Sequence, residues 1–386
     1  MFVDRPGLGL YRVRCRANKM NTRGYMADET CDVLVAGTGL FAEKVVFALA
    51  MTAVKPITVA VGGRNRERMD WLGLSGNARA ALFGRPVRVF SLPLNWDTAA
   101  SIAETLAICR PAVVAQAATV QSPRDLNPPL SLWRQLVAQA GGFGATQVLQ
   151  ALLLSRMARA LKMAGVEAAL LNACYPDAVN AMLAARGERV LCGLGNVAAA
   201  AAMIAAALGR TEPGVVKVLA HHQSPSTWRR PPAERNGTPP RVWVDGRELD
   251  RVFERLETLQ SPNNPGQSIA GTSAAPLIAG LLGHGDYVGH AAGPLGLPGG
   301  YPVAVRGQSL VLDLPAGLRR EEAVAYNQGF AEHDSARLLD DGYVVYADQA
   351  RRVLAGVSPE VAKGFHMSDL DAAAAEMLAL RKRLGG

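Results

Sequence analysis

Long hydrophobic runs are absent from this 386-residue sequence, and charged residues are few. Charged side chains make up 19% of the chain and hydrophobic ones 49%, which is enough apolar material for a core and excludes an intrinsically disordered protein. The longest apolar stretch, residues 197–208, is shorter than the roughly 20 residues that a membrane-spanning helix needs. We therefore expect a soluble protein with no membrane partner.

Clusters of positive charge are also missing, although the formal net charge is +8. The basic residues are dispersed, and no Lys/Arg-rich run with interleaved aromatic residues occurs. Nucleic acid is therefore not expected as a partner. A basic balance instead suits anionic small molecules, including phosphorylated cofactors.

Recognisable cysteine and metal motifs are lacking as well. The cysteines are odd in number and show no CxxC spacing, which is typical of free thiols in a reducing cytoplasm: Cys15, Cys31, Cys109, Cys174 and Cys192. Because no HxH or HExxH pattern occurs either, no metal site is expected. Residues 1–30 contain no apolar segment of a secretory signal, and we predict that they form a tail, with Met26 as an alternative start.

Short apolar strands alternate with helical patterns from residue 31 onward. Buried strands are predicted at the continuous apolar segments 31–36, 57–61, 87–92, 112–117 and 168–172. This alternation predicts an α/β protein with a parallel sheet. We expect a Rossmann-type dinucleotide-binding domain over residues 31–175 and a second, α+β domain for the substrate over residues 176–386.

Two later segments are rich in glycine and proline. Residues 223–240 and 261–300 are expected to be loops or lids rather than core. The second segment contains the sequence GHGD at residues 283–286 and also His290. These polar residues are candidates for covering a ligand, and the alternative is an ordinary exposed loop.

A glycine-rich turn follows the first predicted strand. The sequence VLVAGTGLFAEKV places Gly37, Thr38, Gly39, Leu40 and Phe41 between a strand and a helix, in a GxGxxA pattern. In such a pattern the first glycine makes the tight turn, the second lets a pyrophosphate approach, and the helix N-terminus faces the anion. We predict that these five residues bind a dinucleotide. The alternative is a plain glycine turn.

The end of the second strand suggests which dinucleotide. An NAD site usually offers an aspartate or glutamate there to the ribose hydroxyls. Here the sequence VGGRNRER provides Arg64, Asn65 and Arg66, with no carboxylate before Glu67. Two guanidinium groups suit a 2′-phosphate, so we expect NADP as the cofactor and NAD as the second choice. The alternative is a solvated basic turn.

Later strand-and-helix segments follow in a recognisable order. They read LLNACYPDAVNAML, VLCGLGNVAAAAAMI, VVKVLAHHQSP and GPLGLPGGYPVAVRGQSLVLDLPAGLRREEAVAYNQ. With the glycine turn before them, this order resembles the lactate/malate dehydrogenase superfamily, which also includes the nicotinamide-dependent glycosidases of glycoside hydrolase family 4. The resemblance spans residues 31–335 and implies a Rossmann fold and a nicotinamide cofactor. His222 matches the catalytic histidine of the dehydrogenases.

The chain departs from that family pattern at several positions. The dehydrogenase helix that matches residues 197–204 carries an aspartate that pairs with the histidine and an arginine that binds the substrate carboxylate, and here neither is present. Gly195 stands where the glycosidases have a metal-binding cysteine, and Tyr175 stands where both families have an asparagine. The resemblance therefore implies the fold and the cofactor more strongly than the reaction.

His222 is the candidate catalytic residue. A histidine at the C-terminal end of a strand faces the crevice where α/β sheets bind ligands, and it can exchange the proton that accompanies hydride transfer. By strand alternation, His221 is expected on the opposite face, so the two histidines are not expected to share a metal ion. The alternative is a histidine that only bonds a loop.

Other polar residues are placed to reach the same crevice. Asn172 and Asn196 follow adjacent strands and are predicted to hold the substrate or the nicotinamide, the alternative being that they cap the following helices. Tyr175 and Asp177 lie beside them in the sequence. The resemblance implies that Arg124, in a proline-rich loop, polarises the substrate carbonyl, with a solvated arginine as the alternative.

These features together predict an enzyme, an NADP-dependent oxidoreductase. It is expected to transfer a hydride between the nicotinamide and a carbonyl or imine carbon of a small substrate derived from an amino acid or keto acid. One alternative is a redox-neutral, glycosidase-like enzyme that keeps its nicotinamide bound, and another is a protein that binds NADP without turnover. We expect a cytoplasmic homodimer whose partner is a small-molecule substrate.

Overall fold

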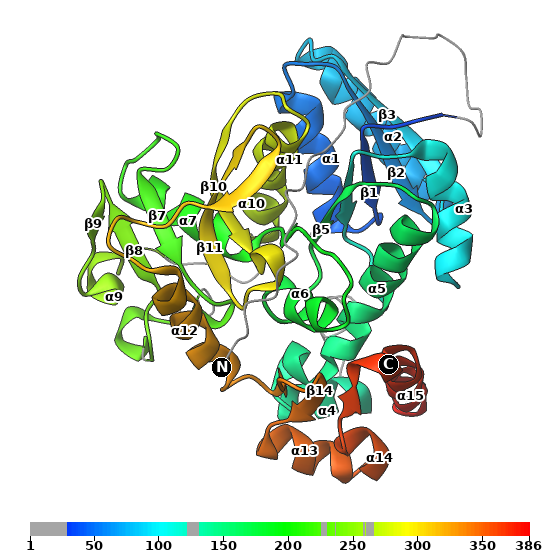
Figure 1. Cartoon of the computed structure of the whole chain (residues 1–386), viewed down its shortest axis with the longest axis vertical. Coiled ribbons are helices and arrows are strands. Elements are labelled where there is room, and N and C mark those ends of the chain that lie inside the picture. Colours follow the sequence, from blue (N-terminus) through cyan, green and yellow to red (C-terminus); the bar gives the residue numbers. More distant parts are fainter. Residues whose placement is uncertain (1–28, 122–130, 225–229, 236, 258, 260–265) are drawn as a thin grey trace.

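Buried strands of small and β-branched residues form one nine-stranded sheet, in the order β12-β11-β10-β6-β5-β4-β1-β2-β3 (Figure 1). The coordinates are those of a computed structural model. It describes residues 29–121, 131–224, 230–235, 237–257, 259 and 266–386.

Six of the nine strands of this sheet are parallel to one another. They are β1 (Val33–Ala36), β2 (Ile57–Gly63), β3 (Val87–Pro93), β4 (Val113–Gln116), β5 (Ala169–Asn172) and β6 (Cys192–Gly193). The order 3-2-1-4-5-6 is that of the Rossmann dinucleotide-binding fold, whose ligands bind outside the carboxyl ends of the strands where the order reverses. The predicted α/β fold class is therefore confirmed, and every strand predicted between residues 31 and 172 is present.

Helices cover both faces of the parallel strands, which explains why the strands are apolar along their whole length. Leu34 and Ala36 of β1 face one core cluster, whereas Val33 and Val35 face the other. The first cluster includes α3 (Ala99–Cys109) and α5 (Gln147–Met163), and the second includes α1 (Leu40–Thr52) and α2 (Arg66–Leu82). Further along the chain, β5 leads into α6 (Pro176–Ala185) and β6 into α7 (Asn196–Ala207).

The segment 261–300 is not the loop or lid that its glycine and proline content predicted. Its described part forms α10 (Gly266–Thr272), α11 (Ala274–Leu281) and β10 (Tyr287–Ala292). The helix α11 buries Leu277, Ile278 and Leu281 against the sheet. Its small residues permit close packing, because a Cβ added at Gly280 would lie only 2.9 Å from the Cβ of Tyr287.

Antiparallel strands extend the sheet beyond β6. The strand β10 pairs with β6 through Ala292 and Gly193 and then with β11 (Gly300–Arg306), which pairs with β12 (Ser309–Leu312). The sheet therefore runs without a break from residues of the first predicted domain, 31–175, into those of the second, 176–386. That division of the chain stays a prediction.

Two small antiparallel sheets complete the α+β part of the molecule. One contains β7 (Val216–Leu219), β8 (Arg241–Val244) and β9 (Arg247–Glu248), and it lies near α9 (Val252–Arg255) and α12 (Arg320–Ala331). The other contains β13 (Ala336–Leu338), β14 (Tyr343–Tyr346) and β15 (Phe365–His366).

The last fifty residues form a module at one end of the molecule, drawn in orange and red in Figure 1. It joins the second small sheet to α13 (Asp348–Ala355), α14 (Pro359–Ala362) and α15 (Leu370–Arg383). The helix α13 packs on α4 (Leu132–Gln139), and α15 packs on α5. Arg159 of α5 donates to Asp371 of α15 at 2.9 Å. The module therefore shares the core of the parallel sheet.

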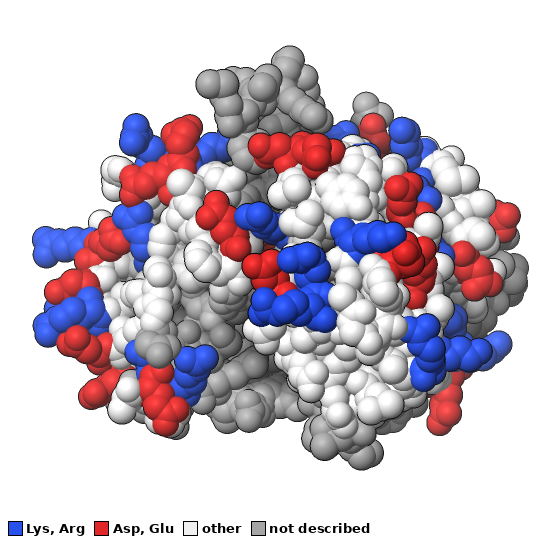
Figure 2. All heavy atoms as spheres, turned by 90° about the horizontal axis from the view of Figure 1, so that it is seen from below, with Lys and Arg blue, Asp and Glu red and all other residues white. Residues whose placement is uncertain are grey.

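Acidic and basic side chains are intermingled on the face shown in Figure 2. Among the described residues, no helix is both long and apolar enough to cross a membrane. The four described cysteines are free thiols and buried, as predicted, while Cys15 and the rest of the predicted tail up to residue 28 lie outside the described residues.

Candidate active site

The turn after β1 requires glycine at its first position. Gly37 has φ of +138°, and its N–H donates to the carbonyl of Gly62 at 2.8 Å. A Cβ at Gly37 would lie 2.9 Å from the backbone nitrogen of Ala118, closer than real Cβ atoms come to backbone. Glycine thus lets the β1 turn pass directly under the segment that follows β4.

The N-terminus of α1 is open to an anion. Gly39 is the N-cap residue, is exposed, and provides no side chain to cap the free N–H groups of the first turn. A Cβ at Gly39 would meet nothing within 4 Å, so there is free space directly above the turn. Leu40 and Phe41 begin the helix, and the ring of Phe41 packs under Gly195 at the start of α7. A phosphate bound here would receive backbone N–H groups and the positive end of the helix dipole.

The basic residues at the end of β2 differ in what they contact. Asn65 is the N-cap of α2 and accepts from the N–H of Arg68 at 2.9 Å. Arg66 is exposed and lies 3.6 Å from Asp70, whereas Arg64 is exposed and forms no ion pair with any described residue. Arg64 is therefore the better placed of the two predicted arginines to meet a ligand phosphate.

Sequence reasoning missed Arg68, which ties this basic turn to the glycine turn. Its Nε donates to the carbonyl of Thr38 at 3.2 Å, and its guanidinium pairs with Glu43 in the first turn of α1. The Arg68 and Lys44 side chains lower the pKa of Glu43 against the opposing effect of its burial. The acidic residue in the first turn of α1 is thus neutralised by cations of the chain itself.

The two adjacent histidines lie beyond the end of β7. That strand stops at Leu219, and residues 221–224 form a turn in which the N–H of Ser224 donates to the carbonyl of His221 at 2.9 Å. The rings of His221 and His222 lie side by side, with their centroids 4.0 Å apart. The prediction that they point to opposite faces is therefore wrong, because strand alternation does not apply in a turn.

His222 is the centre of a buried polar cluster. Its Nε2 lies 2.9 Å from the hydroxyl of Tyr175, and that hydroxyl donates to Oδ2 of Asp334 at 2.7 Å. Its Nδ1 lies 3.8 Å from Oδ2 of Asp177. An aspartate of α6 thus lies beside His222 at a distance too long for a hydrogen bond, and a second carboxylate comes from the turn after α12.

Burial sets the protonation states of this cluster. Burial lowers the pKa of His221 to about 3 and also lowers that of His222, so both imidazoles are neutral at pH 7. Burial raises the pKa of Asp177 to about 7, against a lowering effect of the Asn196 amide. Burial and the neighbouring Asp334 raise the pKa of Tyr175 well above its usual range, which keeps the phenol protonated.

The two predicted asparagines hold the cluster in place. Asn172 is fully buried, and its amide donates to the carbonyl of Cys174 at 3.1 Å and to Asn180 at 2.8 Å, while its Oδ1 accepts from the N–H of Cys174 at 2.7 Å. Asn196 donates to Oδ2 of Asp177. Both side chains are thus engaged within the protein, and they order the turn before Tyr175 and the carboxyl beside His222.

Some members of the cluster are predictable from the sequence and others are not. Tyr175 and Asp177 are candidates because they follow β5. The predicted substrate residue Arg124 lies outside the described residues. Asp334 was missed. It lies 157 positions beyond Asp177 along the chain, and no local pattern marks it. The Asp334 carboxyl can lie here only because residue 144 is glycine. A Cβ added at Gly144 would lie 2.6 Å from Oδ1 of Asp334.

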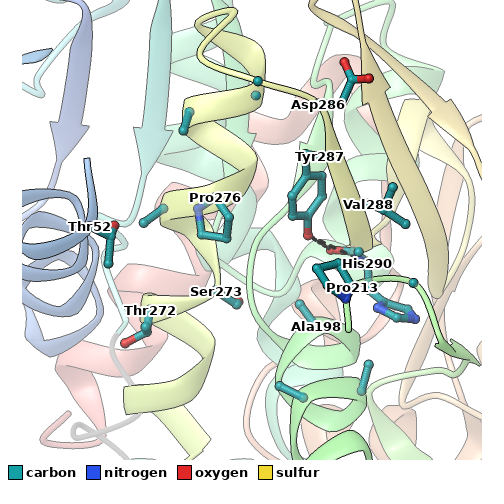
Figure 3. Close-up of a pocket in the computed structure, with 18 of the residues that line it drawn as sticks. Thr52, Ala198, Pro213, Thr272, Ser273, Pro276, Asp286, Tyr287, Val288 and His290 are labelled. Atoms are coloured by element: carbon teal, nitrogen blue, oxygen red, sulfur yellow. Dashed lines mark hydrogen bonds between the residues drawn. The ribbon is translucent and has the colours of Figure 1, made fainter. Parts of the chain in front are cut away.

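A separate pocket of about 660 Å³ lies between α1, α7, α11 and β10 (Figure 3). His290 and residues 284–286, the predicted covering segment, line this pocket instead of the His222 cluster. Nε2 of His290 accepts from the N–H of Val218 at 2.9 Å, and the hydroxyl of Tyr287 accepts from the N–H of His290 at 3.1 Å. These polar groups are satisfied internally, so they hold β10 and β7 in place.

Comparison with known proteins finds similarity at the level of structure. No protein-family model matches the chain, and no curated protein matches it. The lactate dehydrogenase of Eimeria maxima, solved with NADH and oxamate, is 13% identical, with 80% of this chain and 94% of that chain covered and a TM-score of 0.47. The malate dehydrogenase of Salinibacter ruber is 14% identical, with 78% and 94% covered and a TM-score of 0.47.

A malate dehydrogenase of Plasmodium falciparum in complex with NADH is 12% identical, with 78% of this chain and 95% of that chain covered and a TM-score of 0.44. The strand order of the sheet, and not these scores, carries the fold assignment given above.

Proposed function

We propose that this protein is an NADP-preferring oxidoreductase that transfers a hydride between the nicotinamide and a carbonyl or imine carbon. The observation that carries the proposal is the position of the His222 cluster. Tyr175 and Asp177 follow β5, and Asn196 follows β6. The turn at Gly39, where the N-terminus of α1 is open to an anion, follows β1 of the same sheet. A dinucleotide lying across the carboxyl ends of these strands extends from the turn toward His222.

The hydrogen bonds of the cluster define a proton path. Because the Tyr175 hydroxyl donates to Asp334, Nε2 of His222 must carry the proton that it shares with Tyr175, and Nδ1 faces Asp177 as a lone pair. In reduction, Nε2–H passes its proton to the substrate oxygen as the carbon receives the hydride. Nδ1 then takes the proton of the Asp177 carboxyl once the 3.8 Å gap closes. Oxidation runs the same steps in reverse.

The proton path is tested with His222→Gln, which keeps the size of the side chain but cannot exchange protons. Keto acids and cyclic imines are screened for NADPH oxidation with the wild type and the variant. We expect turnover to fall about 10²- to 10⁴-fold while NADPH binding is unchanged. Equal turnover by the two proteins would refute the role of His222.

The cofactor preference is attributed to Arg64, which is free to meet a 2′-phosphate. Fluorescence titration of Arg64→Glu with NADPH and NADH is expected to show weaker NADPH binding and little change for NADH. Arg247→Glu, the same charge change at an exposed site on β9, is the matched control. An unchanged preference in Arg64→Glu would show that Arg64 does not select NADP.

A further inference from the structure

We propose that His221, His222 and Asp334 form a binding site for one divalent transition-metal ion. The inference rests on the proposed function, because the ion would lie beside the reacting carbon of the substrate. One ligand atom from each of the three residues lies within 4.8 Å of the other two. The site departs from the expectation of no metal, which assumed that the two histidines point apart.

Two of the three ligands already have the separation that a shared ion requires. Nε2 of His222 and Oδ2 of Asp334 are 3.6 Å apart. Two ligands about 2.1 Å from one tetrahedral ion are about 3.4 Å apart, so this pair needs almost no movement. The ligand atom of His221 lies within 4.8 Å of both, so a small movement of its ring lets it join the same ion.

An unpaired nitrogen atom of His221 favours a ligand at this place. His221 is only 1% exposed, and its Nδ1 has no hydrogen-bond partner among the described residues. Buried polar atoms in proteins usually have a hydrogen-bond partner or a ligand. The ring of His221 stacks on Phe330 with an interplanar angle of 7°, which holds its orientation.

The surroundings of the three ligands are negative and contain the usual outer partner of a metal-bound histidine. Asp177 and Asp334 are 2% and 8% exposed, and neither forms an ion pair with a described lysine or arginine. A cation here would favour the ionised form of both carboxyl groups. Asp177 lies on the Nδ1 side of His222, where a carboxylate typically orients a histidine that binds metal through Nε2.

The ligand set indicates the class of ion. Two imidazoles and one carboxylate suit Zn²⁺, Fe²⁺ or Co²⁺ and leave positions open for a substrate. The Tyr175 hydroxyl now bridges His222 and Asp334, so an entering ion must displace it or take it as a fourth ligand. With the ion bound, Nε2 of His222 is a ligand and the imidazole proton lies on Nδ1, facing Asp177, so the ion takes the place of Nε2–H in polarising the substrate oxygen.

The test is titration of the full chain with Co²⁺ after chelator treatment, followed by visible absorption. We expect one Co²⁺ per chain with a tetrahedral-type spectrum, and binding weakened at least tenfold in His221→Ala and in Asp334→Asn. His284→Gln, a histidine away from the cluster, is the control and should bind as the wild type does. Binding that is absent, or unchanged in both site variants, would overturn the proposal.

Two further measurements separate this proposal from the proposed function. X-ray absorption of the Co²⁺-loaded wild type should show two imidazole ligands, and a shell of oxygen atoms alone would refute the site even if a variant failed to fold. NADPH titration is run in parallel on the chelated wild type. Loss of Co²⁺ binding with intact NADPH binding defeats only the metal site, and the reverse result defeats only the nucleotide site.

Discussion

Replacing Asp177 by asparagine is expected to stabilise the protein at alkaline pH and to impair its reaction. Asp177 is 2% exposed, its Oδ2 accepts from Asn196, and its Oδ1 has no partner among the described residues. The asparagine oxygen can accept from Asn196 in the same way. The substitution therefore removes an ionisable group from the core without removing the hydrogen bond that holds it.

The size of the effect follows from the pKa of the carboxyl group. Burial raises the pKa of Asp177 from 3.8 to about 7. The folded state thus binds this proton more tightly than the unfolded state, so the contribution to stability is complete below pH 3.8 and is lost as pH rises through about 7. Between pH 5 and pH 8.5, the free energy of unfolding of the wild type should fall by about 2–3 kcal/mol, and that of the asparagine variant should not show this fall.

Urea unfolding across this pH range, with chelator present, measures the difference. The asparagine nitrogen at the position of Oδ1 lacks an acceptor, which costs about 1–3 kcal/mol at every pH and does not change the slope. Asp250→Asn, an exposed aspartate on the surface, should show no such pH dependence. The difference in unfolding free energy between Asp177→Asn and the wild type should therefore change between pH 5 and pH 8.5. If that difference were the same at both pH values, as it should be for Asp250→Asn, Asp177 would not be a carboxyl with a raised pKa.

Three further substitutions test the nucleotide end of the site. Gly37→Ala places a Cβ 2.9 Å from the nitrogen of Ala118 at φ of +138°. We expect its free energy of unfolding in urea to fall by at least about 1–3 kcal/mol, and a wild-type value would contradict the tight turn. Gly39→Ala has free space, so it should fold normally yet bind NADPH more weakly; undiminished binding would place the phosphate elsewhere. Asn65→Ala removes the cap that accepts from Arg68 and should cost about 1 kcal/mol without changing the NADPH preference, whereas a changed preference would make Asn65 a ligand contact.

The parallel half of the fold was readable from the sequence because its signal is local. A strand covered on both faces is apolar at every position, as in VLVA of β1, and each such run is followed by a helix. The glycine and proline content of α10 and α11 predicts loops, and that prediction is wrong. In the molecule, small residues such as Gly280 serve close helix packing, and apolar residues such as Leu277 provide the buried face.

The candidate site was only partly readable, for two physical reasons. The strand β7 ends two residues before His221, and the turn that follows brings together two side chains that a longer strand would have separated. Sequence alternation cannot show where a strand stops. The pairing of His222 with Asp177 also depends on α6 lying beside the end of β7, which is a property of tertiary packing.

Asp334 shows most clearly what local patterns leave out. Its carboxyl reaches Tyr175 only because the 3-10 helix η2 (Gly142–Thr146) offers Gly144 in place of a side chain, and because the hydroxyl of Ser335 donates to the carbonyl of Gly141 at 2.9 Å. These contacts join residues almost two hundred positions apart. The segment 334–335 is also where the chain passes from α12 into the C-terminal module, so docking of that module on α4 and α5 fixes the carboxyl that completes the His222 cluster.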